Sequence, residues 1–271
     1  MIAANSCQIL KPSSVDSAEG HKLKILSYNV QVGMASTRAR HYVTQGWKHV
    51  LPHPKSFDNL DRIAELLCDY DIVGLQEVDA GSLRSYFINQ VEYLAERSRF
   101  PFWHYQTNRN LGKIAQHSNG ILSRFRPQEV VEHKLPGIIP GRGALMARYG
   151  HGKDSFVLML VHLALGKRAR QNQLAYVGEL ISDYPHACVM GDFNTTPDSP
   201  EMKTLFKNTS LCRPDGDYLT FPSWRPHRNI DHILTSESVK VDSIKVLNHA
   251  FSDHLPISME LRLPMDIRVI A

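Results

Sequence analysis

The sequence lacks the marks of a disulfide-rich, zinc-binding or membrane-spanning protein. No two of its cysteines form a Cys-x-x-Cys pair, and the four are widely scattered: Cys7, Cys68, Cys188 and Cys212. This spacing argues against a structural zinc site or a disulfide scaffold, and it predicts free thiols in a reducing compartment. No run approaches the roughly 18 apolar residues of a membrane span, and residues 1–20 contain no apolar signal core. We therefore expect a cytoplasmic protein without a transmembrane segment.

The chain also lacks a strong excess of charge of either sign. Its formal net charge is +4 and its isoelectric point is about 8.8, and 21% of its residues are charged against 42% that are hydrophobic. These are ordinary globular values, which exclude a disordered or fibrous protein. The mild positive charge suits a phosphorylated substrate, but it is too small for the footprint of a dedicated nucleic-acid-binding domain.

Apolar runs and turn residues divide the chain into strands and helices. Residues 1–22 have no periodicity and are expected to form a loose leader, whereas residues 23–271 contain no linker and are expected to form a single domain. Strands are predicted at 23–30, 71–78, 120–123, 155–165, 186–191, 229–235, 239–247 and 255–261, and helices at 57–70, 90–97 and 168–183. Because their order has no strict strand–helix–strand rhythm, several strands should pair antiparallel. The expected fold class is α/β (α+β).

Polar side chains follow the apolar runs at the points where the predicted strands end. The most informative group is Ser252-Asp253-His254, which puts a carboxylate beside an imidazole just ahead of the last long strand. Side chains at strand ends sit on rigid backbone and can point into a shared cleft. The other strand-end candidates are Asn29, Glu77, His162, Asp192, Asn194 and Asp231.

Each of these residues also has an ordinary structural explanation when it is taken alone. A strand-end glutamate such as Glu77 is usually just solvated, and Asn29 can begin a turn. Asp192 and Asn194 would share one side of an extended backbone, or they would form an Asx turn. His162 lies inside an apolar run, where a histidine is more often a hydrogen-bonded core residue than a catalytic one.

Seven short motifs, taken together, resemble the endonuclease/exonuclease/phosphatase superfamily, which includes deoxyribonuclease I, apurinic endonucleases, neutral sphingomyelinases and inositol polyphosphate 5-phosphatases. No single motif is specific, but all seven occur in the order found in that superfamily, between Leu23 and Leu261. The motifs are Ser27-Tyr28-Asn29, Leu75-Gln76-Glu77, Asn119-Gly120-Ile121-Leu122-Ser123, Val161-His162-Leu163, Gly191-Asp192-Phe193-Asn194, Ile230-Asp231-His232-Ile233 and Ser252-Asp253-His254.

The resemblance implies a fold and a metal. The fold would be a four-layer α/β sandwich, with two packed mixed β-sheets flanked by helices. A Mg²⁺ or Mn²⁺ would be held mainly by Glu77, with help from Asn29 and, through water, from Asp253. Few protein carboxylates plus substrate phosphate is what Mg²⁺ prefers, because it gives up its water reluctantly.

The resemblance also implies catalytic roles. Asp192 would orient or deprotonate the attacking water, Asn194 would hydrogen-bond the phosphoryl oxygens, and His162 would donate to another phosphate oxygen. His254 would contact the scissile phosphate, and Asp231 would fix its orientation and raise its basicity. The sequence leaves open whether His254 acts as base, acid or oxyanion stabiliser.

Further polar and aromatic residues near these motifs are candidate substrate contacts. An aromatic and a basic residue beside a phosphate site could stack a base or grip a backbone, or they could belong to a packed loop. Arg170 is expected to brace the fold instead. The candidates are His117, Asn119, Lys167, Arg168, Trp224 and Arg225.

The leading hypothesis is a monomeric, divalent-metal-dependent hydrolase of phosphodiester or phosphomonoester bonds, acting as a nuclease on nucleic acid. One alternative is a phospholipid or sphingomyelin phosphodiesterase, which should show an exposed apolar membrane hairpin; the sequence contains no obvious one. Another is a small-molecule phosphatase of the same superfamily. A non-catalytic binding protein would be expected to have lost Glu77, Asp192 or His254, and all three are present.

Overall fold

A computed structural model describes residues 20–33, 55–137, 141–152 and 155–265, together with 267, 269 and 270. The expected leader lies outside the described residues up to position 19, and so does Cys7. His21 and Lys22 belong to the first strand, so this strand begins two residues earlier than predicted.

Six strands form the first sheet, in the order β11-β12-β1-β2-β4-β3. Its central strands β1 and β2 run parallel, whereas the remaining neighbours pair antiparallel. The strands are β1 (His21–Asn29), β2 (Ile72–Asp79), β3 (Phe102–Asn110), β4 (Gln116–Ser123), β11 (Lys240–Val246) and β12 (Ile257–Leu263).

The second sheet also has six strands, in the order β5-β6-β7-β8-β10-β9. Here β7 and β8 form the parallel pair, and the other neighbours are antiparallel. The strands are β5 (Glu129–Lys134), β6 (Gly143–Tyr149), β7 (Phe156–His162), β8 (His186–Asp192), β9 (Leu211–Cys212) and β10 (Asp231–Ser236).

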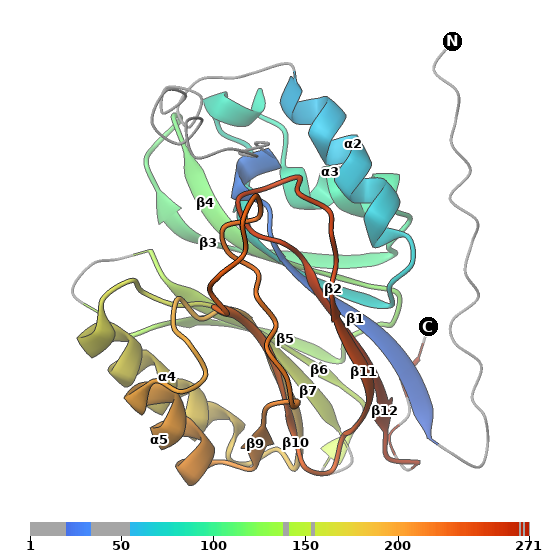
Figure 1. The fold of residues 1–271 in the computed structure, drawn as a ribbon. Helices are drawn as coiled ribbons and strands as arrows, with labels where there is room; N and C mark the ends of the chain where they lie inside the picture. The colour runs from blue at the N-terminus through green and yellow to red at the C-terminus, as the bar shows by residue number, and fades with distance from the viewer. Residues whose placement is uncertain are drawn as a thin grey trace.

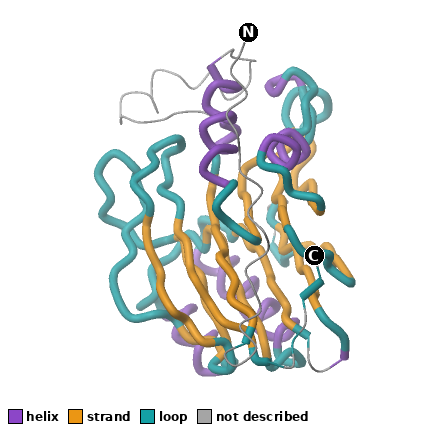
Figure 2. Tube along the Cα trace, turned by 90° about the vertical axis from the view of Figure 1, so that its right-hand side faces the viewer, coloured by secondary structure: helices purple, strands orange, loops and turns teal. Residues whose placement is uncertain are grey.

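The helices cover the outer faces of the two sheets (Figure 1). Helices α2 (Lys55–Leu67) and α3 (Gln90–Arg97) cover the first sheet, and α4 (Lys167–Ile181) and α5 (Pro200–Asn208) cover the second. Two short 3₁₀ turns, η1 (Gln31–Gly33) and η3 (Leu83–Ser85), precede α2 and α3. Figure 2 shows the long strands lying side by side. The predicted four-layer sandwich with two mixed sheets is confirmed.

The side chains of β1 pack into two different layers of the sandwich. Leu23 and Ile25 belong to the apolar cluster between the sheets, whereas Leu26 and Tyr28 belong to the cluster under α2 and α3. Since successive side chains of a strand point to opposite faces, a strand between two layers must be apolar on both. The predicted strand at 23–30 has that composition.

Close packing of the two sheets depends on a glycine in β2. A Cβ added at Gly74 would lie 2.5 Å from the Met190 side chain and 2.6 Å from that of Leu160, both in the opposite sheet. The missing side chain therefore lets β2 approach β7 and β8 closely.

Four strands and one helix were not predicted from the sequence: β3, β5, β6, the two-residue β9, and α5. Strands β3 and β5 have mixed or exposed burial patterns, so they carry no clear apolar alternation. Helix α5 has only nine residues, and its start is set by Ser199, whose side chain accepts a hydrogen bond from the Met202 N–H, followed by Pro200 at the first turn.

The cysteines differ from the sequence-based expectation at one position. Cys188 is free and buried and Cys212 is free and exposed, but Cys68 is disulfide-bonded. The expectation of free thiols is therefore wrong for Cys68, because wide spacing along the sequence does not prevent pairing in the fold. Among the helices of the described ranges, none has the length and apolarity needed to cross a membrane.

Candidate active site

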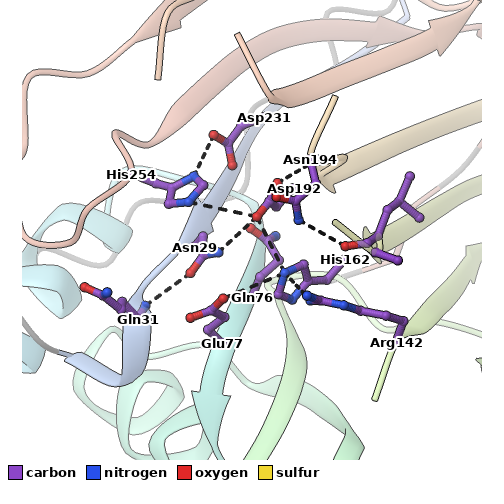
Figure 3. Close-up of polar contacts among 12 residues, drawn as sticks. Asn29, Gln31, Gln76, Glu77, Arg142, His162, Asp192, Asn194, Asp231 and His254 are labelled. Atoms are coloured by element: carbon purple, nitrogen blue, oxygen red, sulfur yellow. Dashed lines mark hydrogen bonds and ion pairs between the residues drawn. The ribbon is translucent and has the colours of Figure 1, made fainter. Parts of the chain in front are cut away.

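The strand-end residues converge at one end of the sandwich, where the carboxyl ends of both parallel strand pairs meet (Figure 3). In the first sheet Asn29 is in register with Gln76, the neighbour of Glu77. In the second sheet Asp192 is in register with His162 on one side and with Asp231 on the other. Loop residues Asp253 and His254 join them from the segment before β12.

Glu77 reaches the cluster because the backbone of β2 departs from a regular strand. Its φ is +55°, in the left-handed region, and the register with β4 shifts between Leu75 and Val78. A bulge of this kind re-aims a side chain, and a non-glycine residue with positive φ costs about 1–3 kcal/mol. The Glu77 side chain is 31% exposed and its Oε1 lies 3.8 Å from Nε2 of His162.

Gly191 brings Asp192 close to β7. Its φ is +140°, and a Cβ there would lie 1.9 Å from the carbonyl oxygen of Val161. Only glycine fits such an approach. This glycine therefore allows the strand end to place the carboxylate of Asp192 beside His162, with 3.5 Å between Oδ2 and Nε2.

Asp231 and His254 form a buried hydrogen-bonded pair. Nδ1 of His254 lies 2.8 Å from Oδ2 of Asp231, and Thr220 Oγ1 donates to the same carboxylate oxygen. Burial alone would lower the pKa of His254, but the charge of Asp231, its hydrogen bond and the neighbouring carboxylates raise that pKa to about 10. The imidazole is thus held as a cation, with Nε2 3.9 Å from Asp192.

Asp192 lies at the centre of the cluster. Its Oδ2 accepts a hydrogen bond from Asn29 Nδ2 at 3.3 Å, and its Oδ1 accepts one from the backbone N–H of Asn194 at 2.9 Å. Burial raises the pKa of Asp192 to about 7, even though the positive charge of His254 acts in the opposite direction. A carboxylate whose pKa lies near neutral pH is suited to accept a proton.

Asn29 and Asp192 each form a turn at the end of a strand and also belong to the cluster. The Asn194 N–H bond to Asp192 closes the Asx turn that was the alternative explanation, and the Gln31 N–H donates to Asn29 Oδ1 at 3.2 Å in the same way. The remaining oxygen of Asp192 faces the cluster, and so does Nδ2 of Asn29, which donates to Asp192, while Oδ1 of Asn29 keeps a second lone pair. The turns therefore orient both side chains toward the cluster.

Arg142 is a fixed cation at the site that the sequence analysis missed. Its Nη1 donates to Nε2 of His162, and both side chains lie near Asp192 and Glu77 (Figure 3). An arginine is always a donor, so His162 must be the acceptor and carry its proton on Nδ1. Burial and the charge of Arg142 hold the pKa of His162 well below its ordinary value, so this ring is neutral.

Arg142 and Thr220 escaped the sequence analysis for different reasons. Arg142 stands between two glycines just before β6, a strand that was not predicted, and Thr220 lies in a loop. The only available signal was a polar residue ahead of the apolar run 144–147, the position that Asp253 and His254 have relative to the last strand; most of the other site residues follow their runs.

Two of the predicted site residues have additional hydrogen-bond partners. Asn194 has φ +52°, and its Nδ2 donates to the carbonyl oxygen of Leu163 at 3.0 Å, which leaves Oδ1 for other contacts. Asp253 is buried, and its Oδ1 accepts from Ser252 Oγ at 3.1 Å. The negative charge of Asp253 also acts on Glu77.

The oxygen-rich side of the cluster fits a divalent cation. Burial and the nearby negative charge of Asp253 raise the pKa of Glu77. A bound cation would relieve the repulsion between these two carboxylates. Carboxylate and amide oxygens are the ligands that Mg²⁺ accepts. Glu77, Asn29 and Asp253 would therefore hold the metal.

A second set of possible ligand atoms lies within 4.8 Å, on Asp192, Asp231 and His254. In this set Nδ1 of His254 and Oδ2 of Asp231 are already bonded to each other at 2.8 Å. A metal there would have to break that bond and displace a protonated imidazole. The Glu77 side is therefore the better metal position.

A cavity of about 760 Å³ opens beside this cluster and includes Glu77 and His162 in its wall. Among the six candidate substrate contacts, His117, Asn119 and Arg168 line it, whereas Lys167, Trp224 and Arg225 do not. Arg109 and Arg142 also line it, so three arginines surround a space of small-molecule size. The buried Asn119 Oδ1 has no hydrogen-bond partner and is available as an acceptor.

His117 is tied to the wall of this cavity. Its Nε2 lies 3.4 Å from Nη1 of Arg84, and burial together with the charges of Arg84 and Arg109 lowers its pKa to about 4. The ring is therefore neutral, with Nε2 as acceptor and Nδ1 as donor.

Comparison with known proteins agrees with this geometry. The sequence model of the endonuclease/exonuclease/phosphatase family matches residues 26–254. The chain belongs to this family. Members of the family are hydrolases of phosphoester bonds, so the resemblance inferred from the seven motifs is confirmed.

Relatives span almost the whole chain. The uncharacterised protein YbhP of Escherichia coli K12 is 26% identical over 267 residues, covering 92% of this chain and 99% of YbhP. A mannosyl-6-phosphatase from Bacteroides thetaiotaomicron is similar in structure, with a TM-score of 0.65 at 20% identity, covering 88% of this chain and 99% of that one. The human Nocturnin catalytic domain has a TM-score of 0.65 at 16% identity, covering 90% of this chain and 95% of that one. At these identities the two structures support the fold alone.

Proposed function

We propose that this family member is a divalent-metal-dependent phosphodiesterase. The observation that carries the proposal is the convergence on one point of an oxygen-rich pair, Glu77 and Asn29, and a proton-handling group, Asp192 with His254. Attack on a phosphodiester builds charge on the phosphoryl oxygens and on the leaving oxygen, and both kinds of group are needed to meet it. A bound Mg²⁺ or Mn²⁺ would neutralise part of the phosphoryl charge.

Within this proposal Asp192 is the residue that takes the proton of the attacking water. Its pKa is raised towards neutrality, whereas His254 is held protonated by Asp231 and is therefore a poor base but a good donor. His254 would then donate to an oxygen of the scissile phosphate, and Asn194 Oδ1 would orient the water.

Arg142 would bind a phosphoryl oxygen in the role that the sequence suggested for His162. The guanidinium carries a permanent charge and several donors, of which His162 occupies one in this structure. His162 would position Arg142 by accepting from it, and its remaining proton on Nδ1 stays available.

Nucleic acid is the first proposed substrate class. It is supported by the net charge of +4 and by the three arginines of the cavity next to the site. A second candidate, the headgroup phosphodiester of a phospholipid, is favoured by the exposed side chain of Leu165 in the cavity lining and by exposed Leu111 and Ile114 on the turn between lining residues Arg109 and His117. Lys167, Trp224 and Arg225 lie outside the cavity lining, so they would contact only a substrate that extends beyond the cavity, as a nucleic acid would.

The test is hydrolysis by purified protein with Mg²⁺ or Mn²⁺, with and without a chelator. Plasmid DNA, single-stranded nucleic acid, phospholipid vesicles and bis-p-nitrophenyl phosphate should be assayed in parallel. We expect metal-dependent turnover of the last compound, lost on chelation and in Asp192→Asn. It should be kept in the control Asp242→Asn, because Asp242 lies on the edge strand β11 and pairs with Arg262 of β12 at 2.7 Å. Turnover that survives both chelation and Asp192→Asn would refute the proposal.

Two accompanying proposals concern the state of the protein in the cell. A monomer is proposed and can be checked by light scattering. A cytoplasmic location was expected from the cysteine spacing, but the disulfide at Cys68 is more typical of an oxidising compartment. Cell fractionation with thiol labelling distinguishes the two locations.

A further inference from the structure

Large apolar side chains are exposed on two neighbouring segments beside the cavity. One segment lies between β2 and α3, and the other is the turn between β3 and β4. The Leu83 N–H donates to the Lys113 carbonyl oxygen at 2.7 Å, so the segments are in contact. We call these residues the apolar rim: Leu83 (39% exposed), Tyr86 (45%), Phe87 (61%), Ile88 (36%), Leu111 (45%) and Ile114 (51%).

The β3–β4 part of the apolar rim borders the cavity beside the candidate site. Cavity-lining Arg109 and His117 flank the β3–β4 turn that carries Leu111 and Ile114. On another part of the lining, Leu165 is 75% exposed. Apolar side chains therefore reach solvent at two places around one opening.

A buried carboxylate fixes the shape of the rim. Asp79 is fully buried, and it accepts hydrogen bonds from the Ser82 N–H at 2.6 Å, from Ser82 Oγ at 2.7 Å and from Ser85 Oγ at 2.9 Å. It also accepts one from Arg84 Nε, which pairs with it as a buried ion pair. The polar side chains of the segment thus point inward and the apolar ones outward.

The backbone reinforces this inverted arrangement. Tyr86 and Phe87 both have positive φ values, +55° and +61°. Two consecutive bulky residues in the left-handed region cost about 1–3 kcal/mol each. Strain of this size, together with exposed aromatic side chains, marks a segment shaped for contact with something else.

The exposed charges on the segments around the cavity are positive. Segments 80–89, 108–114 and 164–169 contain five basic residues and no acidic one, and of the five only Arg84 is compensated, by its buried ion pair with Asp79. The basic residues are Arg84, Arg109, Lys113, Lys167 and Arg168, and all except Arg84 are exposed. A surface that combines apolar tips with surrounding lysines and arginines is complementary to an anionic lipid bilayer.

We propose that the apolar rim and its basic neighbours dock this protein on the surface of an anionic lipid bilayer. The apolar side chains enter the headgroup boundary, the basic residues pair with lipid phosphates, and the cavity opens toward the bilayer. Docking itself does not depend on the proposed function. Its consequence does: if the site is a phosphodiesterase, a lipid headgroup phosphodiester becomes its substrate class.

The experiment is co-sedimentation with vesicles of phosphatidylcholine alone or mixed with phosphatidylglycerol, in the presence of a chelator so that hydrolysis plays no part. We expect binding to the mixed vesicles, weakened by salt. Phe87→Ser combined with Ile114→Ser should reduce it by at least about tenfold. Arg109→Gln combined with Lys113→Gln should reduce it by roughly fivefold per basic residue. Thermal melting of each variant checks its fold.

Met265→Ser is the matched control, since Met265 is 71% exposed but lies after β12, away from the cavity lining. It should bind vesicles like the wild type. Equal binding to neutral and anionic vesicles, no binding, or binding insensitive to both double variants would overturn the proposal. So would a wild-type dimer that the Phe87 and Ile114 changes dissociate, because the rim would then cover a second copy.

Lipid hydrolysis relates this result to the chemistry. The ratio of phosphatidylglycerol hydrolysis to bis-p-nitrophenyl phosphate hydrolysis should fall in the Phe87 and Ile114 double variant. A protein that binds anionic vesicles but hydrolyses no phosphodiester would sustain the docking proposal and refute the proposed function.

Discussion

In both sheets the central strands run parallel, β1 beside β2 in the first and β7 beside β8 in the second. Each pair ends in polar residues, but the chemistry differs. The first pair ends in Asn29 and Glu77, whose oxygens suit a metal, and the second ends in His162 and Asp192, which sit among proton donors and acceptors.

The strand ends also reach the site by different backbone devices. Glu77 is turned by a bulge at which the residue itself has positive φ, whereas Asp192 follows a glycine that has positive φ. In this arrangement the first sheet bears the proposed metal site and the second bears the proposed proton transfer. Substitutions in the metal half and in the proton-transfer half of the site should therefore lower activity in distinguishable ways.

The largest expected effects separate the two halves directly. Glu77→Gln and Asp192→Asn should each lower turnover of a diester by about 10²–10³. Added Mg²⁺ should restore part of the activity of Glu77→Gln, because that change weakens a metal ligand, but none of the activity of Asp192→Asn. Initial rates over a range of Mg²⁺ concentrations measure both. Folded Asp192→Asn with wild-type turnover would remove this residue from the mechanism.

A smaller effect is expected at the residue behind His254. Asp231→Asn removes the negative charge that holds the imidazole protonated, while Thr220 can still hydrogen-bond the amide. Loss of such a supporting partner costs about 10- to 100-fold in activity. Rates should fall without a change in the Mg²⁺ dependence, which assigns the residue to the second half. A shifted Mg²⁺ requirement would instead place Asp231 with the metal ligands.

Stability changes should be smaller still and should leave the chemistry intact. Arg170 donates to Glu201 at 2.9 and 3.1 Å and bridges α4 to α5, which confirms its predicted bracing role. Glu201→Gln should reduce the free energy of unfolding by about 1.5–3 kcal/mol at neutral pH. Chemical denaturation of wild type and variant measures the difference.

The pH dependence of that difference has a definite sign. Burial acts to raise the pKa of Glu201, but its own backbone N–H, Arg170 and Thr195 lower it below the ordinary value of 4.5. Its stabilisation is therefore complete above pH 4.5 and is lost as the pH falls through the lowered value. A difference between wild type and variant that persists unchanged in strong acid would contradict this account.

The smallest effect belongs to an exposed pair in the first sheet. Lys22 and Glu260 lie 2.7 Å apart with side chains 39% and 30% exposed. Solvent screens such pairs, so Glu260→Gln should change the free energy of unfolding by less than about 1 kcal/mol. If Glu260→Gln reduced the free energy of unfolding as much as Glu201→Gln, solvent exposure would not explain which of the two ion pairs stabilises the fold more.

Sequence patterns predicted the central strands well, because residues such as Leu23 to Tyr28 must be apolar on both faces. They also identified eight strand-end candidates: Asn29, Glu77, His162, Asp192, Asn194, Asp231, Asp253 and His254. The edge strands β3 and β5 were missed, since one side of an edge strand is solvated and its pattern is weak.

The rest depends on contacts between distant parts of the chain. Arg142 follows no predicted strand, and its contact with His162 comes from the pairing of β6 with β7. The apolar rim was invisible because Tyr86, Phe87 and Ile88 look like ordinary core residues. In the fold, Ser82 and Ser85 donate hydrogen bonds to the buried Asp79, and this arrangement leaves the apolar side chains of the segment exposed.

Gly74 gives the two-sheet arrangement a further consequence. It lies three residues before Glu77, and the side chains it faces belong to β7 and β8, which end at His162 and Asp192. The distance between the two sheets at Gly74 therefore helps to set the distance between the proposed metal and the proposed base. A methyl group added at Gly74 would push β2 away from β7 and β8, so packing in the core also controls the spacing between the proposed metal ligand and the proposed base.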